Sequence, residues 1–538
     1  MRKFLFSLVT ILALCASASK ASAQAHFLRG DSNHDKKIDL SDGIAILGYL
    51  FLGTATPPCL DAADVNDTGD IDIADAIYCL NFLFLGGSNP AAPYPTFEAD
   101  PTPDELSCLG EPVQVSGNIT ADTTWTRDKS YFLNGAVFVQ AGATLTIEGG
   151  TTVFGKKGTA ETAGLLAIEQ GGKIMAEGSE THPVVFTSEQ PVGQRHKSDW
   201  GGVLLFGKAH LNVAGGTSLA EGFTNKTYGG GANPDDSDSS GKLSYVRIEY
   251  GGVALSVDNE LNGLTCLSVG SGTQLDHIQV KYNDDDAIEW FGGTVNLKYG
   301  VATGVTDDNL DYSFGWQGKV QFYVAHQNKE DIQTSGNGFE VDNSEPPIGT
   351  FGDQPMTNPL ISNVTMCGPG DPAATLGGQG MLLRRGCGSR IYNVIIAGFR
   401  LAGFDIDDAA TTANIAAGNL VVDNSVFFQN GTGGTQHCQE ANSETAAQKE
   451  DDPANAFADT SCNFIHTTMT NNIFATVSPL TDPFNLTGPD FRPLNDALTN
   501  PKDPTTLDPF FDSALYRGAV APTGDNWTQA PWISYLKN

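Results

Sequence analysis

The sequence has few basic residues and, beyond its N-terminus, no long hydrophobic run. Thirty Lys and Arg stand against 63 Asp and Glu in 538 residues, which gives a formal net charge of −33. A surface of that sign repels nucleic acid and anionic membranes and attracts divalent cations. No later stretch approaches the ~18 apolar residues of a membrane-spanning helix. We therefore expect no nucleic-acid partner and no membrane span.

Familiar catalytic signatures are also missing. The chain has no GxSxG motif, no HExxH motif and no phosphate-binding loop. Its histidines are scattered without the spacing of metal ligands. We therefore do not expect an enzyme of the classes that these motifs mark, namely GxSxG hydrolases, HExxH metalloproteases and phosphate-loop nucleotide-binding proteins.

The N-terminus predicts export. Arg2 and Lys3 precede the apolar run FLFSLVTILALCA, and Ala21-Ser22-Ala23 forms a small-x-small cleavage site. This arrangement is typical of a secretory signal peptide over residues 1–23. We expect an extracellular or cell-surface protein, held outside the cell by a partner or released.

Eight cysteines follow Cys15, and an oxidising compartment favours disulfides between them. The sequence alone does not settle the pairing. Cys108 and Cys266 are left unassigned, and the spacings make three bridges plausible: Cys59–Cys79, Cys367–Cys387 and Cys438–Cys462.

Two twelve-residue segments repeat one pattern of oxygen-bearing residues, 33 positions apart. They read DSNHDKKIDLSD (31–42) and DVNDTGDIDIAD (64–75), and each precedes an apolar stretch. Oxygen ligands at positions 1, 3, 5, 7, 9 and 12 suit calcium, which takes 6–8 oxygens, with position 7 giving its backbone carbonyl. The expected Ca²⁺ ligands are Asp31, Asn33, Asp35, Lys37, Asp39 and Asp42 in the first loop, and Asp64, Asn66, Thr68, Asp70, Asp72 and Asp75 in the second.

These paired loops, each leading into one helix, resemble a type I dockerin over residues 27–90. The resemblance implies a small α-helical calcium-binding module that attaches the protein to a cohesin-like partner. The residues themselves leave an alternative open, in which acidic turns cap two helices without a metal. Residues 91–112 are rich in proline and predict a linker.

From residue 113 to residue 538 the pattern changes to short apolar bursts separated by glycine turns. Recurrence every ~20–25 residues, with strands too short to pair as hairpins, predicts a mainly β fold, a right-handed parallel β-helix solenoid. A β-sandwich array is the alternative. Laying residues 142–155 over 163–178 aligns Ile147 with Ile168. A polar insertion spans about 431–470, and expected strands include 184–188, 201–209, 245–252, 275–282, 294–305, 319–326, 361–366, 390–398, 420–430 and 471–477.

The segments SDWGGVLLFGKA and NDDDAIEWFGGTVNLKYGVATGVTDDNLDYSFGW, with the closing RGAVAPTGDNWTQAPW, are similar to a group of secreted bacterial β-helix proteins. The similarity covers about residues 113–535 and implies the fold and an exported protein, without an activity. A dockerin-like module joined to a β-helix also resembles planctomycete surface proteins.

Acidic residues gather in the middle of the expected solenoid. If Asp286 and Asp308 occupy equivalent positions on adjacent coils, their carboxylates stack roughly 5 Å apart. Two carboxylates at so short a distance require a bound cation, a raised pKa or a shared proton. Calcium could be structural or could bridge an acidic sugar, and a solvated acidic turn is the alternative. The acidic residues are Asp284, Asp285, Asp286, Glu289, Asp307, Asp308, Asp311, Glu340 and Asp342.

Four aromatic residues lie close to these acids in sequence: Trp290, Phe291, Phe314 and Trp316. They could form a platform on which a sugar stacks. Cores use the same residue types, and we expect each of the four in the core.

Two functions remain open. The first is binding of a glycan or surface partner by the β-helix. The second is a calcium-dependent polysaccharide lyase acting on acidic polysaccharide, because pectate lyases combine this fold with Asp-bound calcium and an Arg or Lys base. The polygalacturonase-type Gly-His-Gly and Arg-Ile-Lys signatures are absent. Binding is favoured over catalysis, and the candidate catalytic residues are Asp286, Asp308, Lys298 and Arg385, with Arg384 beside the last.

Overall fold

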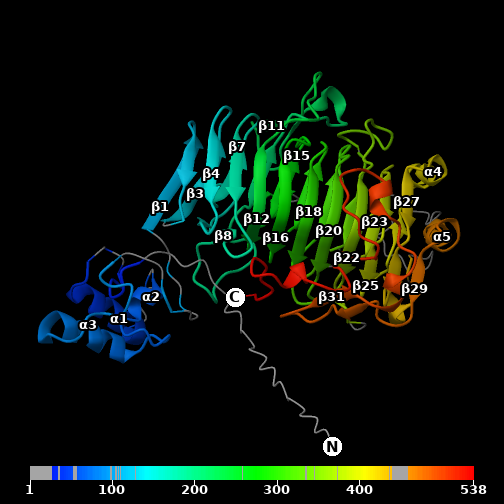
Figure 1. The fold of residues 1–538 in the computed structure, drawn as a ribbon. Helices are drawn as coiled ribbons and strands as arrows, with labels where there is room; N and C mark the ends of the chain where they lie inside the picture. The colour runs from blue at the N-terminus through cyan, green and yellow to red at the C-terminus, as the bar shows by residue number, and fades with distance from the viewer. Residues whose placement is uncertain are drawn as a thin grey trace, which may run out of the picture.

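The structure is a computed structural model, and its described residues form a group of helices followed by a long β-domain (Figure 1). The predicted signal peptide and half of the predicted polar insertion lie outside the described residues. The description covers residues 27–537 except 34, 36, 53–56, 58, 97–99, 103–105, 107, 109–110, 128, 257–258, 334–335, 345, 372–373, 436 and 439–457.

The N-terminal helices are α1 (Leu40–Leu52), α2 (Leu60–Ala63) and α3 (Ile73–Leu85). Each long helix follows one of the two repeated loops. Helix α3 begins with a capping box in which the side chains of Asp72 and Asp75 accept backbone N–H groups, and it ends at the left-handed Gly86. Helices α1 and α3 pack together over Ile46, Val65 and Ala76.

The disulfides differ from two of the three expected pairs. Cys59 is bonded to Cys108, whereas Cys79 is free and buried. Cys79 lies in the small core between the helices, and Cys59 precedes α2 and pairs through its backbone with Cys108. The Cys59–Cys79 prediction was therefore wrong.

The Cys367–Cys387 prediction was also wrong, since both thiols are free and buried. Cys387 belongs to the core inside the solenoid, whereas Cys367 belongs to the apolar cluster under the C-terminal segment. A sheet separates the two side chains. The Cys438–Cys462 prediction is confirmed.

The β-domain is one 25-stranded sheet whose strand pairings are all parallel, coiled into three stacks. Parallel strands require crossover connections, so the parallel β-helix is confirmed and the β-sandwich array is excluded. The first stack consists of β3 (Lys129–Val139), β6 (Leu165–Ile168), β9 (Val203–Phe206), β15 (Leu264–Leu267), β17 (Ile288–Phe291), β19 (Leu310–Ser313), β21 (Phe339–Val341), β23 (Met381–Leu383) and β26 (Asp405–Ile406).

The other two stacks share long strands that bend in the middle. The second consists of β2 (Thr123–Trp125), β4 (Thr144–Glu148), β7 (Lys173–Glu177), β12 (Gly241–Glu249), β16 (Gln274–Lys281), β18 (Asn296–Thr303), β20 (Lys319–His326), β22 (Leu360–Cys367), β24 (Ser389–Tyr392) and β27 (Leu420–Asp423). The third consists of β1 (Glu111–Ile119), β3, β5 (Thr152–Gly155), β8 (Val184–Ser188), the second halves of β12 to β22, β25 (Ile395–Ala397), β28 (Val426–Phe428) and β29 (Ile473–Ala475).

Residues with positive φ make the bend in the long strands, among them His277 (φ 52°). Its ring stacks between those of Tyr245 and Tyr299, at centroid distances of 4.1 and 4.5 Å. Successive coils thus place like side chains over one another.

The core lies inside the coils. Trp290 and Trp316 are fully buried there and stack at a centroid distance of 4.6 Å, which confirms the core expectation for these two. Ile147 pairs with Ala176 rather than with Ile168. The sequence overlay was wrong because it matched strands of two different stacks.

Helices α4 (Ala409–Ala417) and α5 (Ala458–Asn463) lie at the far end of the solenoid (Figure 1). Three antiparallel strand pairs of the described residues lie outside the stacks: β10 (Ser218–Leu219) with β11 (Thr227–Tyr228), β13 (Ala254–Ser256) with β14 (Asn259–Glu260), and β30 (Leu480–Asp482) with β31 (Asp490–Pro493).

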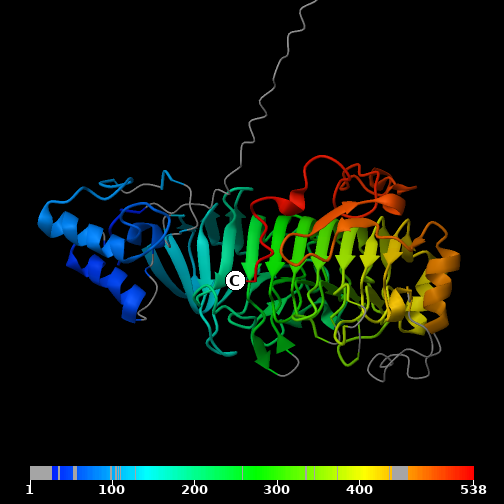
Figure 2. The ribbon, with the colours of Figure 1, turned by 90° about the horizontal axis from the view of Figure 1, so that it is seen from below.

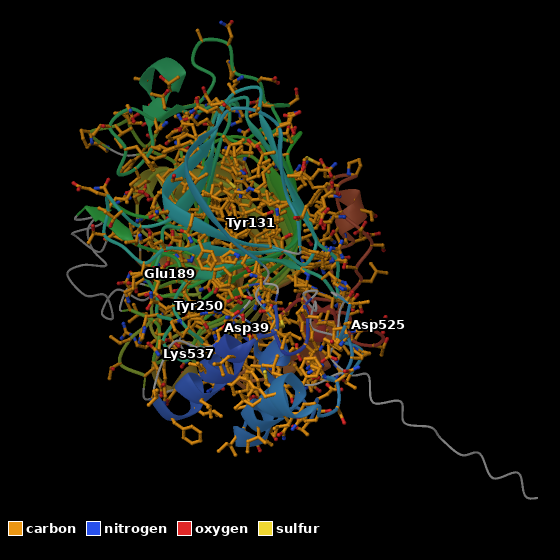
Figure 3. All side chains as sticks on the ribbon, turned by 90° about the vertical axis from the view of Figure 1, so that its left-hand side faces the viewer. Asp39, Tyr131, Glu189, Tyr250, Asp525 and Lys537 are labelled. Carbon is orange, nitrogen blue, oxygen red and sulfur yellow. A yellow bond between two sulfur atoms is a disulfide. The ribbon has the colours of Figure 1, made fainter. Side chains whose placement is uncertain are left out.

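The C-terminal segment runs back along the long strands (Figure 2). Gln279 and Gln321 each hold its backbone by two hydrogen bonds of 2.8–2.9 Å, to Ser534 and Asp512 respectively. Near its end the hydroxyl of Tyr250 donates to the carbonyl of Lys537, and both residues are marked in Figure 3. Among the described residues no helix is long and apolar enough to span a membrane.

Candidate functional site

A row of carboxylates crosses the outer surface of the first stack. Glu289 on β17 is in register with Asp311 on β19, and Asp311 is in register with Glu340 on β21. Parallel strands lie about 4.8 Å apart, so the three side chains stack on one another. The four-residue strands alternate between core and outer positions, which sends Trp290 inward and its neighbour Glu289 outward.

A second set of acids lies where the turns enter these strands. The Asp286 carboxylate accepts the backbone N–H of Asp308 at 2.8 Å, and Asp308 accepts that of Asn337 in the same way. Asn337 in turn accepts the backbone N–H of Gln379 at 2.7 Å. Since a neutral Asn makes this bond equally well, the fold does not require negative charge at positions 286 and 308.

The two sets come together at this surface. Carboxylate oxygens lie within 4.8 Å of one another in three overlapping groups. We call the residues of these groups the acidic row: Asp285, Asp286, Glu289, Asp307, Asp308, Asp311 and Glu340.

The acidic row resists full ionisation. Burial, followed by the charges of neighbouring carboxylates, raises the pKa well above its ordinary value for five of its members. Such crowding is relieved by protons or by a cation. The five are Asp285, Asp286, Glu289, Asp308 and Asp311.

Two arginines border one end of the acidic row. Arg384 contacts Glu340 and donates from Nε to Asp342 at 2.8 Å, and Arg385 Nη1 donates to Asp342 at 2.6 Å. Burial alone would raise the pKa of Asp342, but the two guanidinium groups outweigh it and hold that pKa below its usual value. Of the predicted bases, Arg385 therefore lies near the acids.

Lys298 does not. It lies on β18 in the second and third stacks and pairs with Asp512 at 2.7 Å. A different lysine, Lys197, lies near the turn acids: its Nζ donates to Thr306 Oγ1 at 2.7 Å, and that hydroxyl donates to Asp284 at 3.0 Å. Burial lowers the pKa of Lys197 to about 8. No motif around Lys197 marked it in the sequence, because the contact joins residues over 80 positions apart.

The β10–β11 and β13–β14 hairpins cover the first stack on one side of the acidic row. Tyr228 of β11 joins an apolar cluster with residues of β6, β9 and β15, together with Leu211 before β10 and Leu261 directly after β14. Phe291 and Phe314 are half-buried at its border, with ring centroids 6.0 Å apart. These two phenylalanines therefore lie outside the solenoid core, contrary to expectation.

The first repeated loop folds around its own carboxylates. Asp42 is fully buried and accepts the backbone N–H groups of Asn33 and Asp39 at 3.1 and 2.8 Å. Asp31 accepts that of Asp35 at 3.0 Å, and Asp35 that of Lys37 at 3.0 Å. Burial, with the nearby Asp31 and Asp35, raises the pKa of Asp42 to about 6.

The second loop repeats this geometry. Asp75 accepts the backbone N–H groups of Asn66 and Asp72 at 3.3 and 2.8 Å, and its pKa rises to about 6 because of burial. Asp64 accepts those of Thr68 and Gly69 at 3.1 and 2.7 Å, and the Asp70 carbonyl accepts the Thr68 hydroxyl at 3.4 Å. The two loops thus present equivalent oxygens before equivalent helices.

Both places fit a hard cation by donor type. The buried Asn66 Oδ1 in the second loop and Asn262 Oδ1 beside Glu289 find no hydrogen-bond partner within the described part of the chain. Carboxylate and amide oxygens are the ligands calcium takes. Calcium at either place stays a prediction.

Comparison with protein families identifies the β-domain. Residues 117–472, more than half of the chain, match the family described as pectate-lyase like beta helix domain. The chain belongs to this family, whose name points to a carbohydrate-related role. Neither the curated proteins nor the solved structures gave a match.

Proposed function

We propose that this is an exported calcium-binding protein whose β-helix binds an acidic polysaccharide through cations held at the acidic row. The observation that carries the proposal is the set of three overlapping carboxylate groups, each with oxygens within 4.8 Å of one another. At neutral pH these groups need a counter-charge, and a bound cation with free coordination positions can pass that charge on to a uronate.

The bordering residues support an anionic ligand. Arg384 and Arg385 supply planar donors suited to carboxylates. Burial alone would lower the pKa of Arg384, but the charges of Asp342 and Glu340 outweigh this effect and raise that pKa, so Arg384 stays cationic. Phe291 and Phe314 offer an apolar surface at the other border.

The same proposal makes the N-terminal helices an attachment module of the dockerin type, folded by calcium at the two loops. The two long helices expose matching apolar side chains, more than is usual for a surface that faces solvent. The exposed pairs, each 33 residues apart, are Leu40 and Ile73, Ile44 and Ile77, Phe51 and Phe84, and Leu52 and Leu85, with exposed fractions from 49% to 80%. A cohesin-like domain is the partner this surface suits.

Attachment is tested with the full chain and an immobilised cohesin domain in calcium or in chelator. We expect binding only in calcium, weakened at least tenfold by the double variant Ile44→Asp/Ile77→Asp and unaffected by Val192→Asp, an exposed apolar residue on the solenoid. Equal binding by both variants would reject this surface.

Export is supported by the two disulfides, which persist in oxidising compartments. Detection of the protein in the medium or at the cell surface, with an N-terminus near residue 24, tests it.

The glycan proposal is tested by titrating oligogalacturonate and a neutral glucan oligosaccharide into the protein, in calcium and in chelator. We expect uptake of the uronate only with calcium, and loss of at least tenfold in affinity for Asp311→Asn. Equal binding in chelator would contradict the cation bridge.

A polysaccharide lyase is the second candidate, favoured by the position of Arg385 and by the lowered pKa of Lys197. In that reaction a base removes the C5 proton of a uronate, the C4–O bond breaks, and the product carries a C4=C5 double bond that absorbs ultraviolet light. Absorbing products from a uronate polymer, abolished by Asp286→Ala and by Arg385→Ala, would favour the lyase. Binding without turnover would exclude it.

A further inference from the structure

One of the three carboxylate groups of the acidic row already contains a positive charge that belongs to the protein. This group consists of Asp308, Asp311 and Glu340, whose oxygens lie within 4.8 Å of one another. The Nη2 atom of Arg384 donates a hydrogen bond to the Glu340 carboxylate and forms an ion pair with it. An arginine stays charged in a folded protein, so this group has a counter-charge without any metal.

The fold brings Arg384 to this position from the next coil. Glu340 on β21 is in register with Leu382 on β23, so the column of carboxylates ends there. Arg384 follows Leu382 two positions later and therefore faces outward like Glu340. The carboxylate of Asp342 holds the guanidinium in place, because it accepts hydrogen bonds from Nε at 2.8 Å and from Nη2 at 3.3 Å. The backbone N–H of Arg384 also donates to the Val341 carbonyl at 2.9 Å.

Asn337 supplies further N–H donors to the same group. Its backbone N–H donates to Asp308, and its side-chain Nδ2 donates to Glu340 at 3.2 Å. Together with Arg384, these donors point at oxygens that a metal ion would otherwise use. A metal ion at this place would also lie beside a fixed guanidinium, and like charges repel. We therefore expect the Glu340 end of the acidic row to reject divalent cations.

The neighbouring group of Asp286, Glu289 and Asp311 lacks such a charge. Its oxygens also lie within 4.8 Å of one another, and in the described part of the chain no Lys, Arg or His forms an ion pair with any of the three. Beside Glu289, the amide of Asn262 donates from Nδ2 to the carboxylate, while its Oδ1 is buried without a partner among the described residues. A buried acceptor without a partner beside three carboxylates points to a missing cation.

We propose that Arg384 acts as a tethered cation, which fills the Glu340 end of the acidic row and confines divalent metal to the groups that contain Asp286. This inference rests on the proposed function, because it assumes metal at the acidic row, and it adds where along the row the metal binds. Arg384 thereby sets how many metal ions the row takes. It also fixes the order of positive charges that an acidic sugar meets, with metal at one end and guanidinium at the other.

The first test counts the calcium ions that the full chain binds in calorimetric titrations with calcium alone. Arg384→Gln should bind one calcium more per chain than the wild type, because the third group then lacks its counter-charge. The extra uptake should be absent in Arg384→Lys, which keeps the charge, and in Arg384→Gln/Glu340→Gln, which removes a ligand of the new site. Arg127→Gln is the matched control and should bind like the wild type, since Arg127 is exposed and its partner Glu148 belongs to none of the three carboxylate groups.

The second test needs no variant, so it decides the question even where Arg384→Gln does not fold. Crystals of the wild type are soaked in a terbium salt, and the metal is located by its anomalous scattering. We expect terbium among Asp286, Glu289 and Asp311, and no terbium bound to Glu340.

The outcomes separate the two claims. A metal ion ligated by Glu340 in the wild type, or the same calcium count for Arg384→Gln and the wild type, overturns the tethered cation while the acidic row still binds metal. No terbium anywhere on the row, together with identical calcium uptake by the wild type and Asp311→Asn, removes the proposed function itself, and the inference with it.

Discussion

Asp311 belongs to two of the three carboxylate groups, and its pKa is raised by burial and by Glu340 and Asp342. Replacing its charge should therefore have opposite effects with and without a cation. Without calcium the variant loses repulsion; with calcium it loses a ligand.

We predict that Asp311→Asn unfolds at a higher temperature than the wild type in chelator at pH 7, because the neutral Asn is not repelled by Glu340 and Asp342 and costs less to bury than a carboxylate. It should gain much less from added calcium. Differential scanning calorimetry checks both effects, with the exposed Asp525→Asn as control. A lower unfolding temperature in chelator would show that the charge at 311 stabilises the fold.

His326 is a second buried titratable group whose pKa departs from its ordinary value. Both ring nitrogens lack partners among the described residues, the rings of Phe491 and Tyr535 pack edge-on against it, and burial lowers its pKa to about 4. The unfolded chain takes up this proton near pH 6.5, whereas the folded protein resists until about pH 4. The free energy of unfolding therefore falls as pH drops through this window.

The predicted slope from His326 is about 1.4 kcal/mol per pH unit between pH 6.5 and 4. Denaturant unfolding at several pH values in chelator should give a flatter profile for His326→Leu than for the exposed His196→Leu. Parallel profiles for the two variants would contradict a buried neutral histidine.

At the scale of elements, sequence periodicity located most strands of the second and third stacks. The strands it named did not include the first-stack strands from β15 onward, several of which carry the acidic row. The 22-residue spacing of Asp286 and Asp308 matches the pairing of Ile288 with Leu310 on adjacent coils. Local apolar alternation carries this information because each short strand is selected by its own side chains. The acids converge for the same reason, since stacked coils repeat position by position.

Contacts between distant elements were not predictable in this way. Lys298 and Arg385 are both basic residues near acids in sequence, but only the stack on which each lies decides whether it meets them. The Cys59–Cys108 bond depends on a chain reversal after α3 that leaves no periodic signal.

The Cys59–Cys108 bond closes a loop of 49 residues across the N-terminal helices. We predict that Cys108→Ser lowers the stability of this part by about 2–4 kcal/mol, as expected for the loss of a native disulfide. Hydrogen exchange of α1 and α3 measures it region by region. Cys79→Ser is the matched control and should cost less, because Cys79 is free. An equal effect of both variants would speak against the bond.

At the scale of the whole molecule, charge and fold are coupled through the acidic row. A carboxyl group whose pKa is raised on folding lowers stability as pH rises above its unfolded value, because the unfolded chain ionises first. Near pH 4 the raised pKa values keep these groups largely protonated in the folded protein, so repulsion within the acidic row is small.

Calcium should therefore raise the unfolding temperature of the β-domain strongly at pH 7 and little at pH 4. Scanning calorimetry at the two pH values, with magnesium as the comparison ion, gives the difference. An equal calcium effect at both would mean that the stabilising site is not the acidic row.

The most direct measurement is calorimetric titration of oligogalacturonate into the wild-type protein and into Asp311→Asn, each in calcium and in chelator. The account predicts binding by the wild type in calcium alone, and at least tenfold weaker binding by the variant. Binding that persists in chelator, or that Asp311→Asn leaves unchanged, would contradict it.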